Sequence, residues 1–529
     1  MLPQDRKLPV GIQTFGDIRT NGYLYVDKTA LIWQLANMGK PFFLSRPRRF
    51  GKSLLVSTLE AYFQGKKELF EGLAIEKLET RWEEYPVLHL DLNARKYATP
   101  EDLTAILNQH LEGWEALYGD EKSDRAPEER FTYVIEQAAR KCGRNVVVLV
   151  DEYDKPLLQA LQNESLLESY RATLKAFYGV LKSSDRYLRF VFLTGVAKFA
   201  QVSVFSDLNQ LMDISLNRTF ATLCGITRQE LTDNFQPEIA NLALQNDLST
   251  EEAVEAMARQ YDGYHFHPQG EGVFNPFSVL NAFFNEELGS YWFHTGTPTF
   301  LVKLLKESDY DLRTLMDGVE ADASAFSEYR AETSNPIPLI YQSGYLTIKE
   351  YDRRFRLYKL GFPNEEVRYG FLNFLIPYYT NVSDDERNFH VGKFINELES
   401  GDVDAFMQRF QAFFADFPYE LNDRTERHYQ VVIYLVFKLM GQFTQAEVHS
   451  ARGRADAVVQ TPDYIYVFEF KLDGSAEQAL QQIEEKGYAR PFDTDRRKVV
   501  RVGVEFSAEM RNVKRWKVLS ASSDYQAII

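Results

Sequence analysis

Short apolar runs alternate with helical patterns over the first part of the chain, and this alternation restricts its fold more than any other feature. Four runs have the length and composition of buried strands: PFFLS at 41–45, PVLHLDL at 86–92, VVVLV at 146–150 and FVFLTG at 190–195. Helical patterns separate them, starting after Ser53, at Glu101 and at Ser165. Strands that alternate with helices predict an α/β fold, with a parallel sheet covered by helices. LMDISL, from Leu211, is a candidate fifth strand.

The pattern changes twice further along the chain, and a chain of 529 residues is too long for one hydrophobic core. After the first sheet it becomes mainly helical. The alternating segment YLTIKEYDRRFRLYKLG in this middle part predicts a β-hairpin centred on Asp352-Arg353. The last hundred or so residues follow the order helix, three strands, helix, strand. We therefore expect three parts: a parallel-sheet domain over 1–225, a mainly helical lid or linker over 226–420 and a second α/β domain over 421–529.

Composition and charge limit the classes of function. The N-terminus has no apolar core of a signal peptide, and no run has the length of a membrane-spanning helix, so we expect a cytoplasmic protein without membrane contact. Two cysteines, Cys142 and Cys224, exclude a disulfide framework and a zinc site of several cysteines. The net charge of −16 argues against broad, unspecific binding to nucleic acid, because Lys and Arg make the phosphate contacts. A local basic groove remains compatible with this charge.

A phosphate-binding loop is predicted where the first strand leads into its helix. Gly51, Lys52 and Ser53 follow this strand in SRPRRFGKSLL. Glycine lets the backbone approach a phosphate, and N–H groups at a helix N-terminus attract its oxygens. Lysine reaches the β- and γ-phosphates, and the serine hydroxyl ligates Mg²⁺. Arg46 stands where the pattern G-x-x-x-x-G-K-S/T has a glycine, so the triplet alone also fits an ordinary helix start.

An acidic pair supplies the second half of the predicted site. VVVLVDEYDKP ends a buried strand in Asp151 and Glu152. One carboxylate there can hold the Mg²⁺ of a bound nucleotide and the other can activate a water, although an acidic pair alone also fits a solvated strand end. One further strand lies between the two motifs in the chain, as in NTPases with an extra strand between the nucleotide-binding strands. The next strand ends in Thr194, whose hydroxyl can sense the γ-phosphate or hold the attacking water. Since the carboxyl ends of parallel strands meet at one edge, the sequence predicts an ATP and Mg²⁺ site there.

Longer motifs around these residues resemble the AAA-ATPase-like family of prokaryotic proteins. They are LYVDKTALIWQL, FLSRPRRFGKSLL, LVDEYDKP and FLTGVAKFAQVSVFSDLNQLMDIS. The resemblance spans about residues 5–225 and continues less distinctly, through YDGYHF and VFNPFSVLN, to about Asn281. An arginine-rich loop before GKS is a feature of the family, so the resemblance makes Arg46 an expected residue.

This resemblance also implies roles for the residues of the predicted site. Lys52 and Ser53 would bind phosphate and Mg²⁺, Asp151 would support Mg²⁺, and Glu152 would be the catalytic base. The segments YVDKT and FSDLNQLMDIS would flank the site without an assigned chemistry.

A second candidate site lies near the C-terminus. GRADAVVQTPDYIYVFEFKL places Asp456 on one strand and Glu469 and Lys471 on the next. Residues two apart on a strand share a face, and the TPD turn can bring Asp456 beside them. Two carboxylates and a lysine on one face form a divalent-metal site with a cation that positions or deprotonates water, which is the chemistry of phosphodiester hydrolysis. E-x-K by itself also fits a cross-strand ion pair.

As a whole, residues 422–525 resemble the PD-(D/E)xK nuclease superfamily, in particular the small domain fused to AAA-ATPase-like domains. The element order agrees with the restriction-endonuclease-like core of that superfamily. Some members of such superfamilies keep the fold and lose cleavage. The resemblance implies Asp456 and Glu469 as ligands of Mg²⁺ or Mn²⁺, Lys471 as the catalytic lysine, Glu426 as an auxiliary carboxylate and Gln482 as an auxiliary polar group.

Weaker signals have plain alternatives. His265 and His267 in YHFHP fit a strand or loop better than a metal pair, because no third ligand is near in sequence. Neither cysteine lies in the setting of a catalytic nucleophile. RPRR and DRRKVVR are basic clusters that either contact nucleic acid or form solvated surface. In the first, Arg48 and Arg49 either contact phosphate or a partner subunit, or are surface charge beside an acidic site.

Together these features predict an ATPase fused to a metal-dependent nuclease-like domain. In this hypothesis ATP gates cleavage of nucleic acid, with DNA favoured over RNA, and a homo-oligomer is left open. The alternative is a nucleotide-dependent regulatory or assembly switch whose C-terminal domain binds nucleic acid or protein without cutting, which the charge of −16 fits somewhat better. A third hypothesis is a bare ATPase with a degenerate tail. The first requires Asp456, Glu469 and Lys471 to converge on a solvent-reachable face, and the other two predict a plugged cleft or a lysine that points away.

Overall fold

The computed structural model describes most of the chain. The described residues are 6–198, 211–295, 301, 305, 312–326, 335–379, 384–415, 426–441, 445–448, 455–507, 509–510 and 512–520. Within these ranges, no helix is long and apolar enough to cross a membrane.

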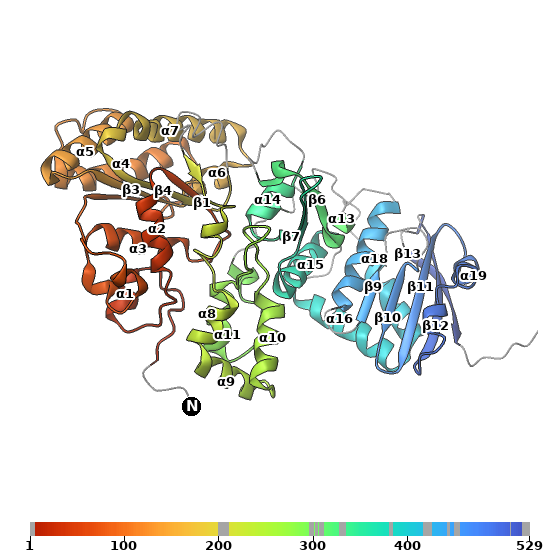
Figure 1. Cartoon of the computed structure of the whole chain (residues 1–529). Coiled ribbons are helices and arrows are strands. Elements are labelled where there is room, and N and C mark those ends of the chain that lie inside the picture. The colour runs from red at the N-terminus through yellow and green to blue at the C-terminus, as the bar shows by residue number, and fades with distance from the viewer. Residues whose placement is uncertain are drawn as a thin grey trace, which may run out of the picture. The chain divides into compact units, whose positions relative to one another are not determined.

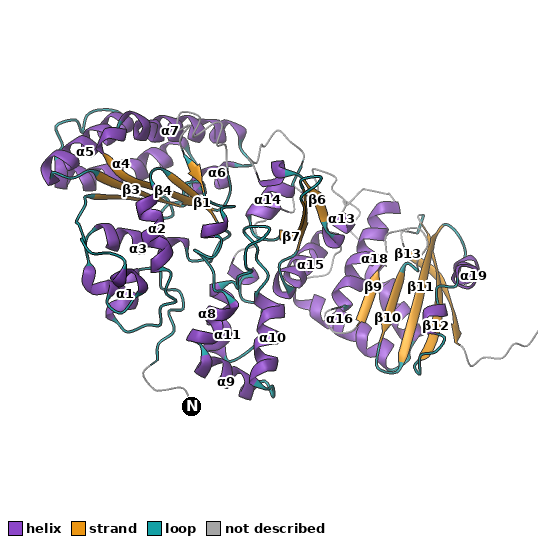
Figure 2. Ribbon diagram, in the orientation of Figure 1, coloured by secondary structure: helices purple, strands orange, loops and turns teal. Residues whose placement is uncertain are grey.

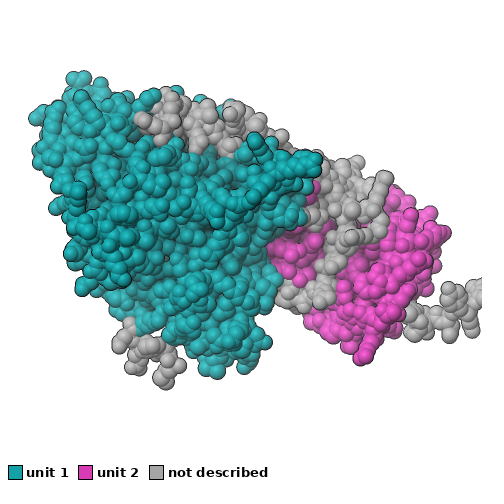
Figure 3. All heavy atoms as spheres, viewed as in Figure 1, with its two compact units in different colours: residues 1–310, 318–367 teal, residues 311–317, 368–529 magenta. Residues whose placement is uncertain are grey.

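Contacts between residues divide the chain into two compact units, coloured separately in Figure 3. Unit 1 comprises residues 1–310 and 318–367, and unit 2 comprises 311–317 and 368–529. The division into three parts that we expect from the sequence remains a prediction.

Unit 1 contains a five-stranded parallel sheet in the order β2-β3-β4-β1-β5. The four predicted strands form, whereas LMDISL contributes only a two-residue strand that pairs with β1. In the sheet β4 separates β1 from β3, and β2 lies at an edge. The strand before the phosphate loop and the strand that leads into the acidic pair therefore flank the strand that contains Thr194. The strands are β1 (Phe42–Ser45), β2 (Val87–Asp91), β3 (Val146–Asp151), β4 (Leu188–Gly195) and β5 (Met212–Asp213).

Helices cover both faces of this sheet, which makes three layers (Figures 1 and 2). On one face lies α3, with α1 and α2 near it, and on the other lie α4, α5 and α7. Side chains such as Leu107, Phe131, Val148 and Phe177 form one continuous apolar core between the second group and the sheet. The helices are α1 (Phe15–Thr20), α2 (Thr29–Met38), α3 (Lys52–Phe63), α4 (Pro100–Tyr118), α5 (Pro127–Cys142), α6 (Lys155–Ala160) and α7 (Glu164–Ser183).

The rest of unit 1 is a helical cluster followed by a small antiparallel sheet. The helices α8 to α11 pack around their own core, which includes Phe235, Leu242 and Met257. The sheet has the order β6-β8-β7 and contains the predicted hairpin. Its turn is formed by residues 353–356, because Asp352 is the last residue of β7. These elements are α8 (Arg228–Asn234), α9 (Gln236–Gln245), α10 (Thr250–Tyr261), α11 (Pro276–Asn285), β6 (Val319–Ala321), α14 (Ile337–Gln342), β7 (Thr347–Asp352) and β8 (Leu357–Gly361).

Unit 2 contains a five-stranded mixed sheet in the order β13-β12-β11-β10-β9, in which only β11 and β12 run parallel. The predicted order of helix, three strands, helix and strand is confirmed, and β13 is an additional strand. Phe468 packs on Phe406 and Phe437, while Val467 faces the core beneath α19, so helices cover both faces (Figure 1). The elements are α13 (Leu312–Asp317), α15 (Glu365–Tyr379, which begins in unit 1), α16 (Asp384–Glu399), α17 (Val403–Ala415), α18 (Glu426–Met440), β9 (Gln445–Val448), β10 (Ala457–Gln460), β11 (Tyr464–Leu472), α19 (Ala476–Lys486), β12 (Lys498–Ser507) and β13 (Asn512–Ser520).

Candidate functional site

The predicted phosphate loop connects β1 to α3. Gly51 precedes the helix in the left-handed region, with φ of 86°, where glycine is the favoured residue. Lys52 is the first helical residue and is 5% exposed. Its ammonium donates to the carbonyl oxygens of Arg46, at 3.2 Å, and Pro47, at 3.1 Å. The lysine side chain therefore folds back over the loop, and the free N–H groups at the start of α3 form the anion-binding end of the helix.

Arg46 does not occupy the loop but is built into the protein beneath it. The side chain is 1% exposed, and its guanidinium donates to the carbonyl oxygens of Ser45, Ser215 and Phe220. It also lies 3.9 Å from the ring centroid of Phe266. Burial lowers the pKa of Arg46. The residue that departs from the common glycine pattern thus anchors the loop, whereas Arg48 and Arg49 are exposed.

Residues outside the parallel sheet support the same loop. The indole Nε1 of Trp292 donates to the carbonyl oxygen of Arg48 at 3.0 Å. Gly344, with φ of 92°, lies so close to Pro47 that a Cβ atom there would come within 2.6 Å of the proline ring. The rings of Tyr264 and Phe266 pack edge-on against Phe50. Segments from the helical cluster and the small sheet therefore hold the phosphate loop.

The acidic pair lies where the sequence places it, at the carboxyl end of β3. Asp151 is 5% exposed, and burial raises the pKa of its carboxyl group, an effect opposed by a hydrogen bond from Ser53 and by the charge of Lys52. Glu152 follows in the left-handed region, with φ of 51°, and is half-buried. A non-glycine residue in this region is uncommon and is often a feature of functional sites. The hydroxyl of Ser53 and the carboxylate of Asp151 thus meet beside Lys52, in the arrangement that holds Mg²⁺ together with phosphate oxygens.

Thr194 is the penultimate residue of β4, the strand between β1 and β3. It is fully buried, and its hydroxyl has no hydrogen-bond partner among the residues that the structure describes. An unpaired buried hydroxyl costs about 1–3 kcal/mol, so such a group calls for an explanation. A ligand or an ordered water at the edge of the sheet would provide the missing partner.

Tyr153 and Asp154, which follow the acidic pair, link it by hydrogen bonds to the end of this strand. Tyr153 donates its backbone N–H to the carbonyl oxygen of Thr194, at 3.1 Å, and its hydroxyl to that of Ala197, at 2.8 Å. The carboxylate of Asp154, which is 1% exposed, accepts the N–H groups of Val196, at 3.0 Å, and Ala197, at 2.6 Å. Burial raises the pKa of Asp154 to about 7. These contacts fix Glu152 and Thr194 relative to each other.

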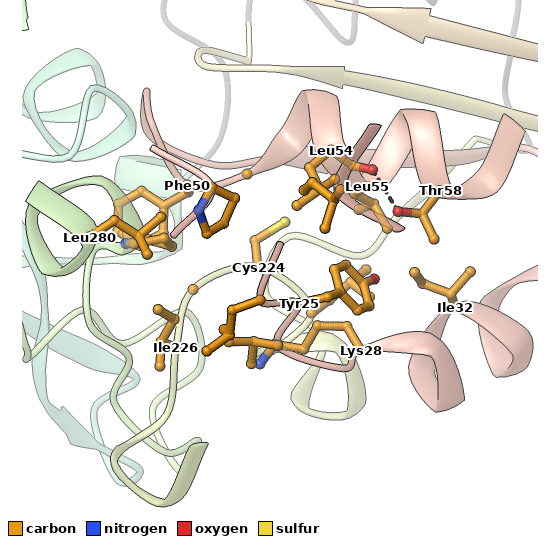
Figure 4. A pocket seen from close by; sticks show the side chains of 18 of the residues that line it. Tyr25, Lys28, Ile32, Phe50, Leu54, Leu55, Thr58, Cys224, Ile226 and Leu280 are labelled. Atoms are coloured by element: carbon orange, nitrogen blue, oxygen red, sulfur yellow. Dashed lines mark hydrogen bonds between the residues drawn. The ribbon is translucent and has the colours of Figure 1, made fainter. Parts of the chain in front are cut away.

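An apolar pocket opens beside Gly51 (Figure 4). Its empty space is about 660 Å³, including the mouth. Tyr25 and Lys28 line it from the segment before α2, Leu54 from α3, and Cys224 from the segment before α8. The ammonium of Lys28 pairs with Glu230 at 2.6 Å. The YVDKT segment, to which the sequence assigns no chemistry, therefore forms one wall of this pocket.

The second candidate site lies on one face of the sheet in unit 2. Glu469 and Lys471 project from β11 toward α19, and Gln482 of that helix meets them. Asp456 is not on a strand as expected but immediately precedes β10, and its carboxylate accepts the N–H of Phe470 at 2.8 Å. The four predicted residues Asp456, Glu469, Lys471 and Gln482 therefore converge.

Glu469 is the most buried member of this group, at 2% exposed. Burial and the nearby Asp456 raise its pKa to about 7, although Lys471 opposes the shift. Its Oε1 atom accepts from Gln482 and lies 3.4 Å from Lys471 Nζ, whereas Oε2 has no partner among the described residues. Burial also raises the pKa of Asp456. Two carboxylates with an unpaired buried oxygen fit a divalent cation, which takes oxygen ligands.

Comparisons with known proteins match the two parts of the chain that contain the candidate sites. A family model described as Predicted AAA-ATPase matches residues 9–205, and one described as PD-(D/E)XK nuclease superfamily matches residues 424–516. An uncharacterized protein in the vnfD 5' region of Azotobacter chroococcum mcd 1 is 38% identical over 523 residues, which are 96% of this chain and 98% of that protein. The chain belongs to this AAA-ATPase-like family. Its C-terminal part is a domain of the PD-(D/E)XK nuclease superfamily.

These two families associate the AAA-ATPase-like protein with nucleotide binding and with nuclease-like function, and both generally use a divalent metal. Glu426 is the first residue of α18, but its side chain lies outside the described residues. His265 and His267 hydrogen-bond to backbone groups of their own loop, at Gly270 and Gln269. Among the described residues, no group of three or more His, Cys, Asp or Glu side chains is arranged to hold a metal ion.

Sequence reasoning did not single out two residues of the nucleotide site in the AAA-ATPase-like protein. Asp154 belongs to the DEYD segment, where a third acid two residues after the acidic pair was an available signal. Trp292 carried no signal, because its contact with the phosphate loop joins segments far apart in the chain.

Proposed function

We propose that this protein binds and hydrolyses ATP at the edge of the parallel sheet. The observation that carries the proposal is the contact between the Ser53 hydroxyl and the buried Asp151 carboxylate, next to Lys52 at the start of α3. The unpaired hydroxyl of Thr194 supports it.

In this proposal the phosphates of ATP lie against the N–H groups at the start of α3. The Lys52 ammonium exchanges its two carbonyl partners for oxygens of the β- and γ-phosphates. Ser53 and Asp151 hold Mg²⁺, which neutralises charge on these phosphates when bound. Glu152 accepts a proton from the attacking water, and Thr194 donates to the γ-phosphate or orients that water. The adenine base enters the apolar pocket, where Tyr25 and Leu54 bury it.

For unit 2 we propose metal-dependent cleavage of phosphodiester bonds in nucleic acid, with DNA favoured over RNA and with ATP as the gate. Asp456 and Glu469 would hold Mg²⁺ or Mn²⁺, and the ion would supply activation of a water and stabilisation of charge on the phosphate. Lys471 would position the attacking water, and Gln482 keeps the lysine beside Glu469. Glu426 is an auxiliary carboxylate in the same proposal.

One observation favours a second candidate, a nucleotide-dependent switch that binds nucleic acid or protein without cutting it. The Gln482 amide donates to Glu469 and accepts from Lys471 at 2.5 Å, so it closes the space between these side chains. Lys471 nevertheless keeps 29% of its side chain exposed and does not point away from the carboxylates. Q482A separates the two candidates. If Gln482 blocks the site, its removal should increase cleavage; if Gln482 positions Lys471, its removal should decrease cleavage.

The test uses the full chain with plasmid and single-stranded substrates, with Mg²⁺ or Mn²⁺, and with or without ATP. Lys52→Ala should abolish ATP binding and the effect of ATP on cleavage, and Lys471→Ala should abolish cleavage but leave ATP hydrolysis intact. Lys66→Ala and Lys517→Ala are matched controls, because both lysines are exposed and lie outside the sites. If Lys52→Ala binds ATP as the wild type does, the proposed location of the nucleotide site is wrong. If no metal supports cleavage while ATP hydrolysis persists, the switch is the better description. Light scattering with and without ATP tests for a homo-oligomer.

A further inference from the structure

The tip of the β7–β8 hairpin concentrates positive charge around an exposed aromatic ring. Its four residues are Arg353, Arg354, Phe355 and Arg356, and all of them are exposed. Phe355 leaves 62% of its surface in solvent. A protein with a net charge of −16 thus places three arginines and a phenyl ring on one turn.

The body of the hairpin, and not its tip, is part of the fold. Ile348 and Leu360 pair across the two strands and are buried, at 2% and 0% exposed. Further out, the rings of Tyr351 and Tyr358 pack against each other at a tilt of 36°, with their centroids 4.5 Å apart. The strands therefore hold the turn firmly, while the side chains of the turn contribute nothing to a core.

No carboxylate of the described residues forms an ion pair with the guanidinium groups at the tip. The carboxylate of the adjacent Asp352 accepts the backbone N–H groups of Arg354, at 2.7 Å, and Phe355, at 3.0 Å. The neutral Gln269 amide lies against Arg353, and Arg354 lies 5.0 Å from the ring centroid of Phe355. None of the three arginines forms an ion pair with another described residue.

Arg356 occupies a position for which its side chain is poorly suited. Its φ is 55°, in the left-handed region that favours glycine or asparagine at the end of a hairpin turn. Such backbone strain often accompanies function. An arginine at this position completes the cluster at the expense of local stability.

We propose that this hairpin tip binds single-stranded nucleic acid. Three guanidinium groups without a carboxylate partner among the described residues match consecutive phosphates, and they do so in a protein whose overall charge repels a polyanion. A firmly mounted, exposed phenyl ring matches the face of an unpaired base, which a duplex keeps stacked. Guanidinium groups next to the ring strengthen such stacking. The contact goes beyond the proposed cleavage site, since these residues lie in unit 1 and the binding needs no bond to be broken.

The test is fluorescence anisotropy with labelled single-stranded DNA and RNA of one sequence, at several salt concentrations and in EDTA so that no metal-dependent cleavage occurs. The R353A/R354A/R356A protein should bind at least tenfold more weakly, and the slope of log K against log salt should fall by about 2. Phe355→Ala should weaken binding roughly 5- to 100-fold, and Phe355→Trp should restore it. Arg356→Gly should weaken binding and raise the melting temperature, because it removes a charge and the backbone strain together.

The matched control is K66A/K67A/K77A, which removes the same charge from exposed lysines elsewhere in unit 1. The proposal requires the control to keep wild-type affinity. It is overturned if both triple variants lose affinity equally, if the hairpin variants bind like the wild type, or if the wild type binds neither single-stranded DNA nor single-stranded RNA. A hairpin effect in a protein that never cleaves would contradict the proposed nuclease activity and leave this inference standing.

Discussion

Replacing Thr194 by valine should stabilise the protein and slow ATP hydrolysis at the same time. The substitution keeps the branched shape of the side chain at a fully buried β-strand position and replaces the hydroxyl by a methyl group. In the structure that hydroxyl has no partner among the described residues, so the change removes a buried polar group without breaking a hydrogen bond. Most substitutions at a fully buried residue act in the opposite direction.

The magnitude follows from the cost of an unpaired hydroxyl, about 1–3 kcal/mol. Allowing for some relaxation around the site, Thr194→Val should raise the free energy of unfolding by about 1 kcal/mol, which shifts the melting temperature of a unit of this size by about 1–2 °C. Hydrolysis loses a hydrogen bond to a charged phosphate or to the attacking water, worth about 1.5–3 kcal/mol. The turnover number should therefore fall roughly 10- to 100-fold, with little change in ATP affinity.

Thr347→Val is the matched control. Thr347 is also a buried strand threonine in unit 1, at 2% exposed, but its hydroxyl accepts from His265 N at 2.7 Å and donates to His265 O at 3.2 Å. This variant should lose about 1–3 kcal/mol of stability, because a backbone N–H group is left unpaired, and should retain turnover. Calorimetry of the ligand-free protein and a steady-state ATPase assay measure both quantities. The reasoning is refuted if Thr194→Val destabilises the protein as Thr347→Val does, or if it hydrolyses ATP at the wild-type rate.

Three further predictions concern residues around the nucleotide site. Asp154→Asn keeps an oxygen for the two N–H groups that Asp154 binds, so ATP affinity should stay within about twofold. The neutral amide accepts these bonds more weakly than the carboxylate and holds Glu152 and Thr194 less firmly, so turnover should fall about tenfold. Equal turnover in a steady-state assay would contradict the positioning role. Trp292→Phe removes the donor to Arg48, at a cost of about 1 kcal/mol, and should weaken ATP binding about fivefold in calorimetry without changing the fold. Glu366, which is 2% exposed, accepts the backbone N–H of Trp292 at 2.7 Å, and burial raises its pKa to about 7. The unfolded chain therefore binds fewer protons between about pH 4.5 and 7, and wild-type stability should fall by roughly 3 kcal/mol over that range. Glu366→Gln should reduce this loss of stability with pH, which chemical denaturation at several pH values measures. A pH profile identical to that of the wild type would contradict the prediction.

Much of the fold could be predicted from the sequence, because buried strands and amphipathic helices leave periodic patterns. β1 to β4 are apolar runs, and the alternation in the hairpin gave its strands, although not the position of its turn. β13 could not be predicted in the same way. It is an edge strand whose Lys514, Arg515 and Lys517 are exposed, so its composition is that of a polar surface segment.

The residue types of the candidate sites were predictable for a different reason. Phosphate binding, metal binding and water activation need particular functional groups, and Lys52, Asp151 and Glu469 carry them at spacings set by local structure. Asp154 and Trp292 depend instead on which N–H and carbonyl groups distant segments leave available. A spacing rule within one segment does not contain that information.

Arg46 belongs to a local sequence motif and also depends on contacts with distant segments. At the start of the loop a glycine would leave space, whereas the arginine fills it and links the loop to Phe220 and Phe266. Arg48 and Pro47 contact Trp292 and Gly344, so consecutive loop residues are attached to segments that follow the parallel sheet. The ammonium of Lys52 in turn donates to the carbonyl oxygens of Arg46 and Pro47, and ATP would draw it away from them. If ATP binds in this loop as we propose, the changed contacts of Lys52 would reach Trp292 and Gly344, which hold the same loop. Such a connection is a physical requirement of the proposed control by ATP, and the buried arginine would serve it better than the usual glycine.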